Sequence, residues 1–247
     1  MKLNLLASWT LRVTLMMALT VGLPAVSLAK GGVSKSMKPA DNHQEIELFA
    51  AMAAGDIEVE LIPKDSTSST VRFVNKSDKP VAVKLPNAFA GVPVLAQFGG
   101  GMGMGGMGGG GLGGGFLNLA PEKVGTVKVG TVCLEHGKID PNPHVKYELR
   151  PIAEFTDNGE VIEICRMLAN GEIPQNTAQA AAWNLMDKLS WQELAAKDKV
   201  RRSNGYFEKW FSFAELNLAQ RAISVASQRS KARASTQSES PGESYNQ

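Results

Sequence analysis

The spacing of apolar residues changes partway along this chain, and that change limits the folds open to it. Up to about residue 134, short segments such as 57–62 and 70–75 place an apolar residue at every second position. Alternation with a period of two is typical of a strand with one buried and one wet face. From about residue 157, apolar residues recur every three or four positions, as in an amphipathic helix. The sequence therefore predicts an α+β protein, with a β part followed by an α part.

The β part is expected to span residues 44–140. Segments 81–86, 92–98 and 124–134 are further strand candidates, and polar turn segments rich in Ser, Asp, Asn and Pro separate the first of them. Short strands at this spacing predict a small antiparallel immunoglobulin-like β-sandwich. Residues 44–54 fit either a short helix or a lead-in strand.

A glycine-rich segment, residues 99–115, interrupts the β part. Only four residues in it are not glycine: Met102, Met104, Met107 and Leu112. Glycine loses the most conformational freedom on folding and buries no side chain, so we expect a disordered hairpin loop. An alternative use of the three methionines is to bind Cu(I) through their thioethers.

The α part is expected over residues 152–229, as about four helices. Three capping-box patterns, in which a Ser or Asp is followed three residues later by a Glu, predict helix starts: Asp157 with Glu160, Ser190 with Glu193, and Ser212 with Glu215. The remaining segment, 230–247, is rich in Ser, Gln and Glu, and we expect it to be a disordered tail.

The N-terminal segment, residues 1–29, has the pattern of a secretory signal peptide. Lys2 and Arg12 are its only charges, an apolar run covers 13–23, and Ser27-Leu28-Ala29 offers a cleavage site. Cleavage after Ser27 and an uncleaved anchor are the alternatives. We therefore expect a secreted, periplasmic or cell-envelope protein, with no transmembrane span after signal removal.

Charge is balanced overall but unevenly placed. The chain has 26 basic and 24 acidic side chains, and removal of Lys2 and Arg12 leaves a formally neutral mature chain. Segment 197–233 nevertheless carries a formal charge of +6. Such a segment is either the solvated face of a helix or a contact for an anionic envelope surface. No nucleic-acid-binding motif accompanies it, so we expect no nucleic-acid partner.

The chain has two cysteines, Cys133 and Cys165. In an oxidising compartment they predict a disulfide, which would stabilise the fold by about 3 to 4 kcal/mol through loop closure. An alternative is a zinc or copper site formed by Cys133, His136 and His144, whose donors suit either metal. Otherwise we expect no cofactor, and we assign no catalytic residue.

Several motifs resemble an uncharacterised group of exported bacterial proteins over about residues 131–196. They are the segment 131–138, Pro141-x-Pro143, Tyr147-x-Leu149-x-Pro151, and 178–183. The resemblance implies export and brings no known activity with it.

The block Ala178-Gln179-Ala180-Ala181-Ala182-Trp183 also resembles the Thr-Gln-x-Ala-Ile-Trp block of thioester domains in bacterial surface adhesins. Those domains join a Cys to a Gln and capture amines. The resemblance implies a thioester candidate formed by Cys133 and Gln179, although Ala178 replaces the threonine and the family's cross-linked glutamine comes from a later motif.

The sequence thus predicts an exported protein of binding or structural role at the envelope, more in keeping with a non-enzymatic protein than with an enzyme. The alternatives are an exported zinc- or copper-binding protein and a covalent thioester-type adhesin.

Overall fold

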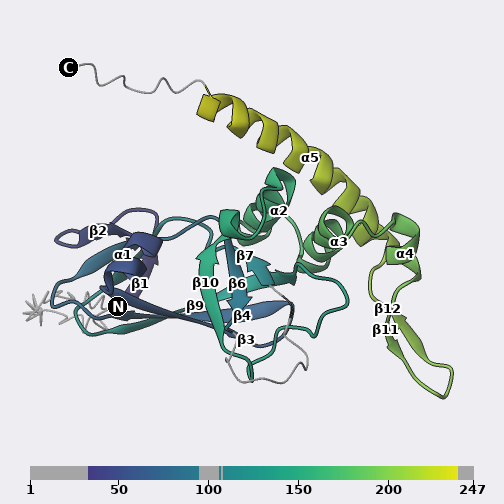
Figure 1. Cartoon of the computed structure of the whole chain (residues 1–247), viewed down its shortest axis with the longest axis horizontal. Helices are drawn as coiled ribbons and strands as arrows, with labels where there is room; N and C mark the ends of the chain where they lie inside the picture. The colour runs from purple at the N-terminus through teal and green to yellow at the C-terminus, as the bar shows by residue number, and fades with distance from the viewer. Residues whose placement is uncertain (1–32, 95–105, 107, 239–247) are drawn as a thin grey trace, which may run out of the picture. The chain divides into compact units, whose positions relative to one another are not determined.

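Six antiparallel strands close into a barrel in the computed structural model of this protein (Figure 1). The structure describes residues 33–94, 106 and 108–238. Around the barrel, the strands follow the order β10 (Tyr147–Pro151), β3 (Ile57–Pro63), β4 (Ser68–Asn75), β9 (Val124–Cys133), β7 (Gly108–Gly110) and β6 (Phe89–Pro93). Alternate residues of these strands point inward, and Leu61, Val71 and Phe73 are buried in the resulting core.

A four-stranded sheet lies beside the barrel and shares its core. Its order is β1 (Val33–Ser36), β8 (Phe116–Leu119), β5 (Val81–Lys84) and β2 (Gln44–Glu47), with β2 parallel to β5. Helix α1 (Leu48–Ala54) follows β2 directly, so segment 44–54 is both a strand and a helix. Leu48 of α1 packs in the same core as the barrel strands.

The antiparallel β part and the helical part after it are confirmed, but the expected immunoglobulin-like sandwich is wrong. The sheet closes because β7 pairs with both β6 and β9, and because β10 pairs with both β6 and β3. Neither β7 nor β10 was among the strands expected from alternation. The candidate strand 92–98 lies mostly outside the described residues, and β6 begins earlier in the sequence.

The expected disorder of the glycine-rich segment is wrong for residues 108–115. Gly108–Gly110 form β7, and a side chain at Gly111 would overlap the carbonyl oxygen of Asn87. Glycine is used here because the backbone passes too close to its neighbours for a Cβ, and ladder hydrogen bonds offset the entropy cost. Residues 99–105 and 107, which hold all three methionines of the expected Cu(I) ligand set, lie outside the described residues.

Four helices follow the barrel, as expected: α2 (Gly159–Ala169), α3 (Gln175–Met186), α4 (Trp191–Ala196) and α5 (Phe213–Ser238), with a short 3₁₀ turn (Ile152–Glu154) before them. The capping boxes at Ser190 and Ser212 are confirmed, since each serine hydroxyl and its glutamate carboxylate accept the expected backbone hydrogen bonds. The first box is wrong by one residue, because Asn158 caps α2. A hairpin, β11 (Asp198–Arg201) and β12 (Phe207–Lys209), connects α4 to α5.

The helices pack on the outer wall of the barrel. Their shared core combines Val132 of β9 and Leu134, just after that strand, with Ile164 of α2 and Trp183 of α3. Within the described residues, the structure contains no helix with the length and apolar character needed to cross a bilayer. The signal-peptide segment, 1–29, lies outside them.

The expected disordered tail, 230–247, is wrong for its first part, since α5 continues to Ser238. Local composition alone favoured disorder, but ion pairs from Arg229 and Arg233 to the α2 region hold this end of the helix. Tertiary contacts override weak local preference in this way. Residues 239–247 lie outside the described residues.

Candidate functional site

Helix α2 presents a buried carboxylate toward α5. Val161, Ile164 and Cys165 of α2 are fully buried in the core shared with the barrel and α3. Glu163 lies on the same helix and is only 1% exposed. A buried carboxylate is unfavourable unless it is paired and hydrogen-bonded, so its partners define the chemistry of this region.

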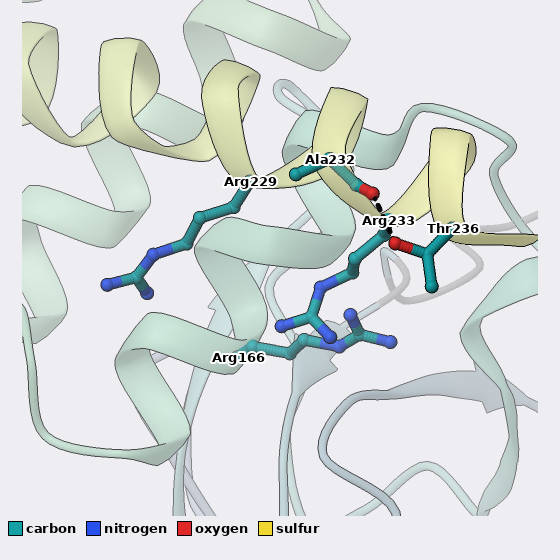
Figure 2. A pocket seen from close by; sticks show the side chains of 5 residues that line it. All are labelled: Arg166, Arg229, Ala232, Arg233 and Thr236. Atoms are coloured by element: carbon teal, nitrogen blue, oxygen red, sulfur yellow. Dashed lines mark hydrogen bonds between the residues drawn. The ribbon is translucent and has the colours of Figure 1, made fainter.

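Two arginines share that carboxylate. Arg166, one turn along α2, places its Nη1 2.6 Å from Glu163 Oε1. Arg233, from α5, places its Nε 2.6 Å from the same oxygen. Figure 2 shows the guanidinium groups of Arg166 and Arg233 side by side. One negative charge therefore holds two positive charges together across the α2–α5 interface.

A third arginine completes the cluster. Arg229, one turn before Arg233 on α5, places its Nη1 2.7 Å from the carboxylate of Glu172. This hydrogen bond, together with one from Asn170, lowers the pKa of Glu172 below its ordinary value. Both side chains of the pair are partly exposed, so Arg229 can exchange this partner for another anion at small cost.

Arg166, Arg229 and Arg233 line a groove between α2 and α5, with a volume of about 490 Å³. Ala232 and Thr236 of α5 supply the rest of its lining (Figure 2). We call this feature the arginine groove. Three arginines face the two carboxylates of Glu163 and Glu172, so one positive charge remains uncompensated. Within the described residues, the buried Nε–H of Arg166 also has no hydrogen-bond partner.

This arrangement suits an oxyanion. Guanidinium groups donate paired, parallel hydrogen bonds that match the oxygens of phosphate, sulfate or carboxylate groups. Thr236 adds a hydroxyl, although its Oγ1 donates to the carbonyl of Ala232 at 2.9 Å. No cluster of three or more His, Cys, Asp or Glu side chains that could hold a metal ion occurs in the described part of the chain.

The structure brings Cys133 and Gln179 together, but through the backbone of Cys133. Gln179, 2% exposed on α3, accepts from the Cys133 backbone N–H at 2.9 Å and donates to its carbonyl at 2.8 Å. Gln175, one turn earlier, donates to the carbonyl of Thr131 at 3.0 Å. The pairing of β9 with β4 ends at Gly130, but β9 continues to Cys133. The side-chain amides of Gln175 and Gln179 make hydrogen bonds with backbone groups of this last part of β9, on the side where β4 has ended.

The hydrogen bonds between Gln179 and the Cys133 backbone give these two residues a structural role that needs no thioester. Both polar atoms of the Gln179 amide bond the backbone, and the Cys133 thiol donates to the carbonyl of Glu135 at 3.3 Å. Gln179 therefore acts as a support for the end of β9.

The expected disulfide is not formed: Cys133 and Cys165 are both free and buried. Cys133 lies opposite Gly108 in the β7–β9 ladder, whereas the Cβ position of the next residue, Gly109, is 3.1 Å from Cys165 Sγ. Successive residues of a strand face opposite sides, so the two thiols lie on opposite faces of the barrel wall. Burial raises the pKa of Cys133 to about 11 and that of Cys165 to about 12.

The expected metal ligands Cys133, His136 and His144 are not brought together either. The ring Nε2 of His136 accepts from Lys197 Nζ at 2.7 Å, and its ring lies edge-on to Trp183. His144 is exposed on a loop, where its backbone N–H donates to Asn142. Among the described residues, neither histidine therefore joins Cys133 in a cluster that could bind a metal ion.

Lys197 is the centre of this second cluster. Its ammonium group lies 5.2 Å from the ring of Trp183 and 5.6 Å from that of Trp210. Burial and the charge of Lys197 lower the pKa of His136 below its ordinary value. These contacts hold the loop after β9 against α3 and against the start of the hairpin, so we assign the cluster a structural role.

Comparison with protein-family models, with curated proteins and with solved structures gives no match for this chain. The two sequence resemblances therefore stay predictions.

The sequence interpretation located half of the arginine groove. The +6 segment, 197–233, includes Arg229 and Arg233; a contact for an anionic envelope surface is one of its two interpretations, and the solvated face of a helix is the other. Glu163 and Arg166 were missed because they read as ordinary polar positions of α2. Their roles depend on α5 lying against α2, for which the sequence carried no signal.

Proposed function

We propose that this chain is exported and binds an oxyanion-bearing ligand of the cell envelope in the arginine groove, without catalysing a reaction. The observation that supports this most strongly is the meeting of Arg166, Arg229 and Arg233 around one hollow, with a positive charge left over. Arginine side chains are costly to hold together without anions, so a third anion would stabilise the cluster.

The expected mode of binding follows from the partners already in place. Arg166 and Arg233 are fixed by Glu163, which gives the ligand two positioned donors. Arg229 is held only by the more exposed Glu172 and can turn toward the ligand. A preorganised pair with one adjustable arm reduces the entropy lost on binding. The positive segment 197–233 would also steer an anion toward the site.

Export is the second half of the proposal, and it is supported by the signal pattern of residues 1–29. Intact mass of the protein purified from the envelope or culture medium tests it. A mature chain beginning at Lys30, or at Leu28 for the alternative cleavage, is expected. A cytoplasmic protein that keeps Met1 would contradict it.

Calorimetric titration of the mature chain with inorganic phosphate and with poly(glycerol phosphate) tests the binding. Arg233→Gln and Arg229→Gln are each expected to weaken binding about tenfold, since a charged hydrogen bond contributes roughly 1.5 to 3 kcal/mol. Arg221→Gln is the matched control, because Arg221 is exposed on α5 and does not line the groove. Equal losses in all three variants would mean that the ligand responds only to overall charge.

A further inference from the structure

The hairpin β11–β12 carries aromatic and basic side chains on an exposed tip. Every residue from Arg201 to Lys209 is exposed. Two of them are large aromatic residues, Tyr206 at 51% and Phe207 at 58% exposure. Figure 1 shows the hairpin standing clear of α5 and of the barrel. Two neighbouring aromatic side chains rimmed by polar residues make the tip a candidate contact surface.

The tip is an ordered turn. The backbone N–H of Arg202 donates to the carbonyl of Tyr206 at 2.8 Å, and that of Gly205 donates to the carbonyl of Arg202 at 3.1 Å. Gly205 has φ of +84°, the left-handed conformation that this tight turn requires. The aromatic residues are thus presented in a fixed place.

Three of the four basic side chains of the hairpin form ion pairs with its two carboxylates, and one of these pairs joins Lys199 to Glu208 at 4.0 Å. The acidic Asp198 lies at the base, where Arg201 and Lys209 contact it at 2.8 and 2.9 Å. At the tip, Arg202 lies 5.4 Å from the ring of Tyr206, and among the described residues no carboxylate lies within ion-pair distance of it. Four basic and two acidic side chains leave residues 198–209 with a formal charge of +2.

We infer that this hairpin docks end-on into an anionic lipid surface. Tyr206 and Phe207 both lie at the exposed end of the hairpin, and its net charge of +2 favours an anionic partner. End-on entry into the headgroup region covers both, at the depth where aromatic side chains partition. Arg202, which lies beside Tyr206 and outside the ion pairs at the base, reaches anionic headgroups, and a basic side chain contributes about 1 kcal/mol near such a surface. This inference does not depend on the arginine groove.

Co-sedimentation with vesicles tests it. We expect the mature chain to bind vesicles of equal parts phosphatidylglycerol and phosphatidylcholine, to bind pure phosphatidylcholine vesicles at least tenfold more weakly, and to be released by high salt. The double variant Tyr206→Ser/Phe207→Ser should lose at least tenfold in binding to the mixed vesicles. Arg202→Gln should lose several-fold.

Two control variants make the result specific. Phe213→Ser removes an aromatic residue that is 80% exposed outside the hairpin, and Arg221→Gln removes an exposed charge of α5 that does not line the arginine groove. Both are expected to bind vesicles like the parent chain. Because the hairpin residues are exposed, the tip variants should keep the parent's circular dichroism and melting temperature. Absence of vesicle binding, or an equal loss in Phe213→Ser or Arg221→Gln, would overturn the inference.

Discussion

Arg233 of α5 places its Nε 2.6 Å from the carboxylate of the buried Glu163 on α2. This pair joins the last described turns of the chain to the helical core and fixes one wall of the arginine groove. Arg166 contacts the same carboxylate oxygen. Stability and anion binding are therefore coupled at Glu163, and the two can be separated by substitution.

Glu163→Gln should make the protein less stable and a tighter anion binder. Two guanidinium groups lose the charge of their shared partner, which is expected to cost about 2 to 3 kcal/mol, reduced by the partial exposure of Arg233. Removing the negative charge should also raise phosphate affinity about threefold or more, because the glutamine oxygen still accepts from the two guanidinium groups but no longer repels the anion. Urea denaturation and phosphate titration of the same sample measure both effects.

Glu172→Gln is the matched control for that variant, because Glu172 pairs with Arg229 nearer the surface. It should cost less than about 1 kcal/mol of stability. Weaker phosphate binding by Glu163→Gln would contradict the assignment of the groove.

Gln179→Ala should destabilise the fold by about 2 to 4 kcal/mol. The substitution leaves the buried N–H and C=O of Cys133 without partners, and each unsatisfied group costs roughly 1 to 3 kcal/mol. Gln175→Ala removes one half-buried hydrogen bond to Thr131 and should cost about 1 kcal/mol. Equal midpoints in urea for the two variants would show that the Gln179 contact does not support β9.

The two thiols should be free in the folded protein and slow to react. Burial raises both pKa values, and the thiolate is the reactive form. A thiol-specific reagent at neutral pH should label neither cysteine rapidly in the native chain and both in urea. A native mass lower by the two hydrogens of a disulfide would contradict this, as would one lower by the ammonia of a thioester.

His136 should make stability fall as the solution is acidified. Its pKa is lowered in the folded state, chiefly by burial and then by Lys197, while the carboxylates of Asp187 and Glu193 oppose the shift. The unfolded chain therefore binds the proton first. The contribution is fully present above the ordinary pKa of 6.5 and is lost progressively as the pH falls below it.

Comparison of the parent with His136→Gln isolates this effect. Between about pH 7.5 and about pH 5.5, the free energy of unfolding should fall more in the parent than in the variant. If the free energy of unfolding depends on pH in the same way in both proteins, His136 does not cause the loss of stability. The carboxylates of Asp187 and Glu193 remain in both proteins, so the variant removes only the imidazole and its interactions with them.

Local patterns predicted the elements that local chemistry determines. The boxes at Ser190 and Ser212 begin helices as expected, because the capping hydrogen bonds are made within a few residues. Barrel closure could not be predicted in the same way. It depends on β7, three glycines without any alternation, whose place in the sheet is set by close approach to β6 and β9.

The candidate site shows the same division. Charge counting identified the basic segment that holds Arg229 and Arg233. Glu163 and Arg166 gain their significance only from the packing of α2 against α5, which no local pattern encodes. The disulfide expectation is wrong for a related reason, since the pairing of Cys133 with Gly108 decides which side of the barrel wall its thiol faces.

The most direct test of the arginine groove is to locate a heavy oxyanion by anomalous scattering in crystals of the mature chain soaked in tungstate. The account predicts the strongest peak between the guanidinium groups of Arg166, Arg229 and Arg233, and its loss in crystals of Arg233→Gln. A groove without a peak, while tungstate occupies other basic positions such as Arg202, would contradict the account.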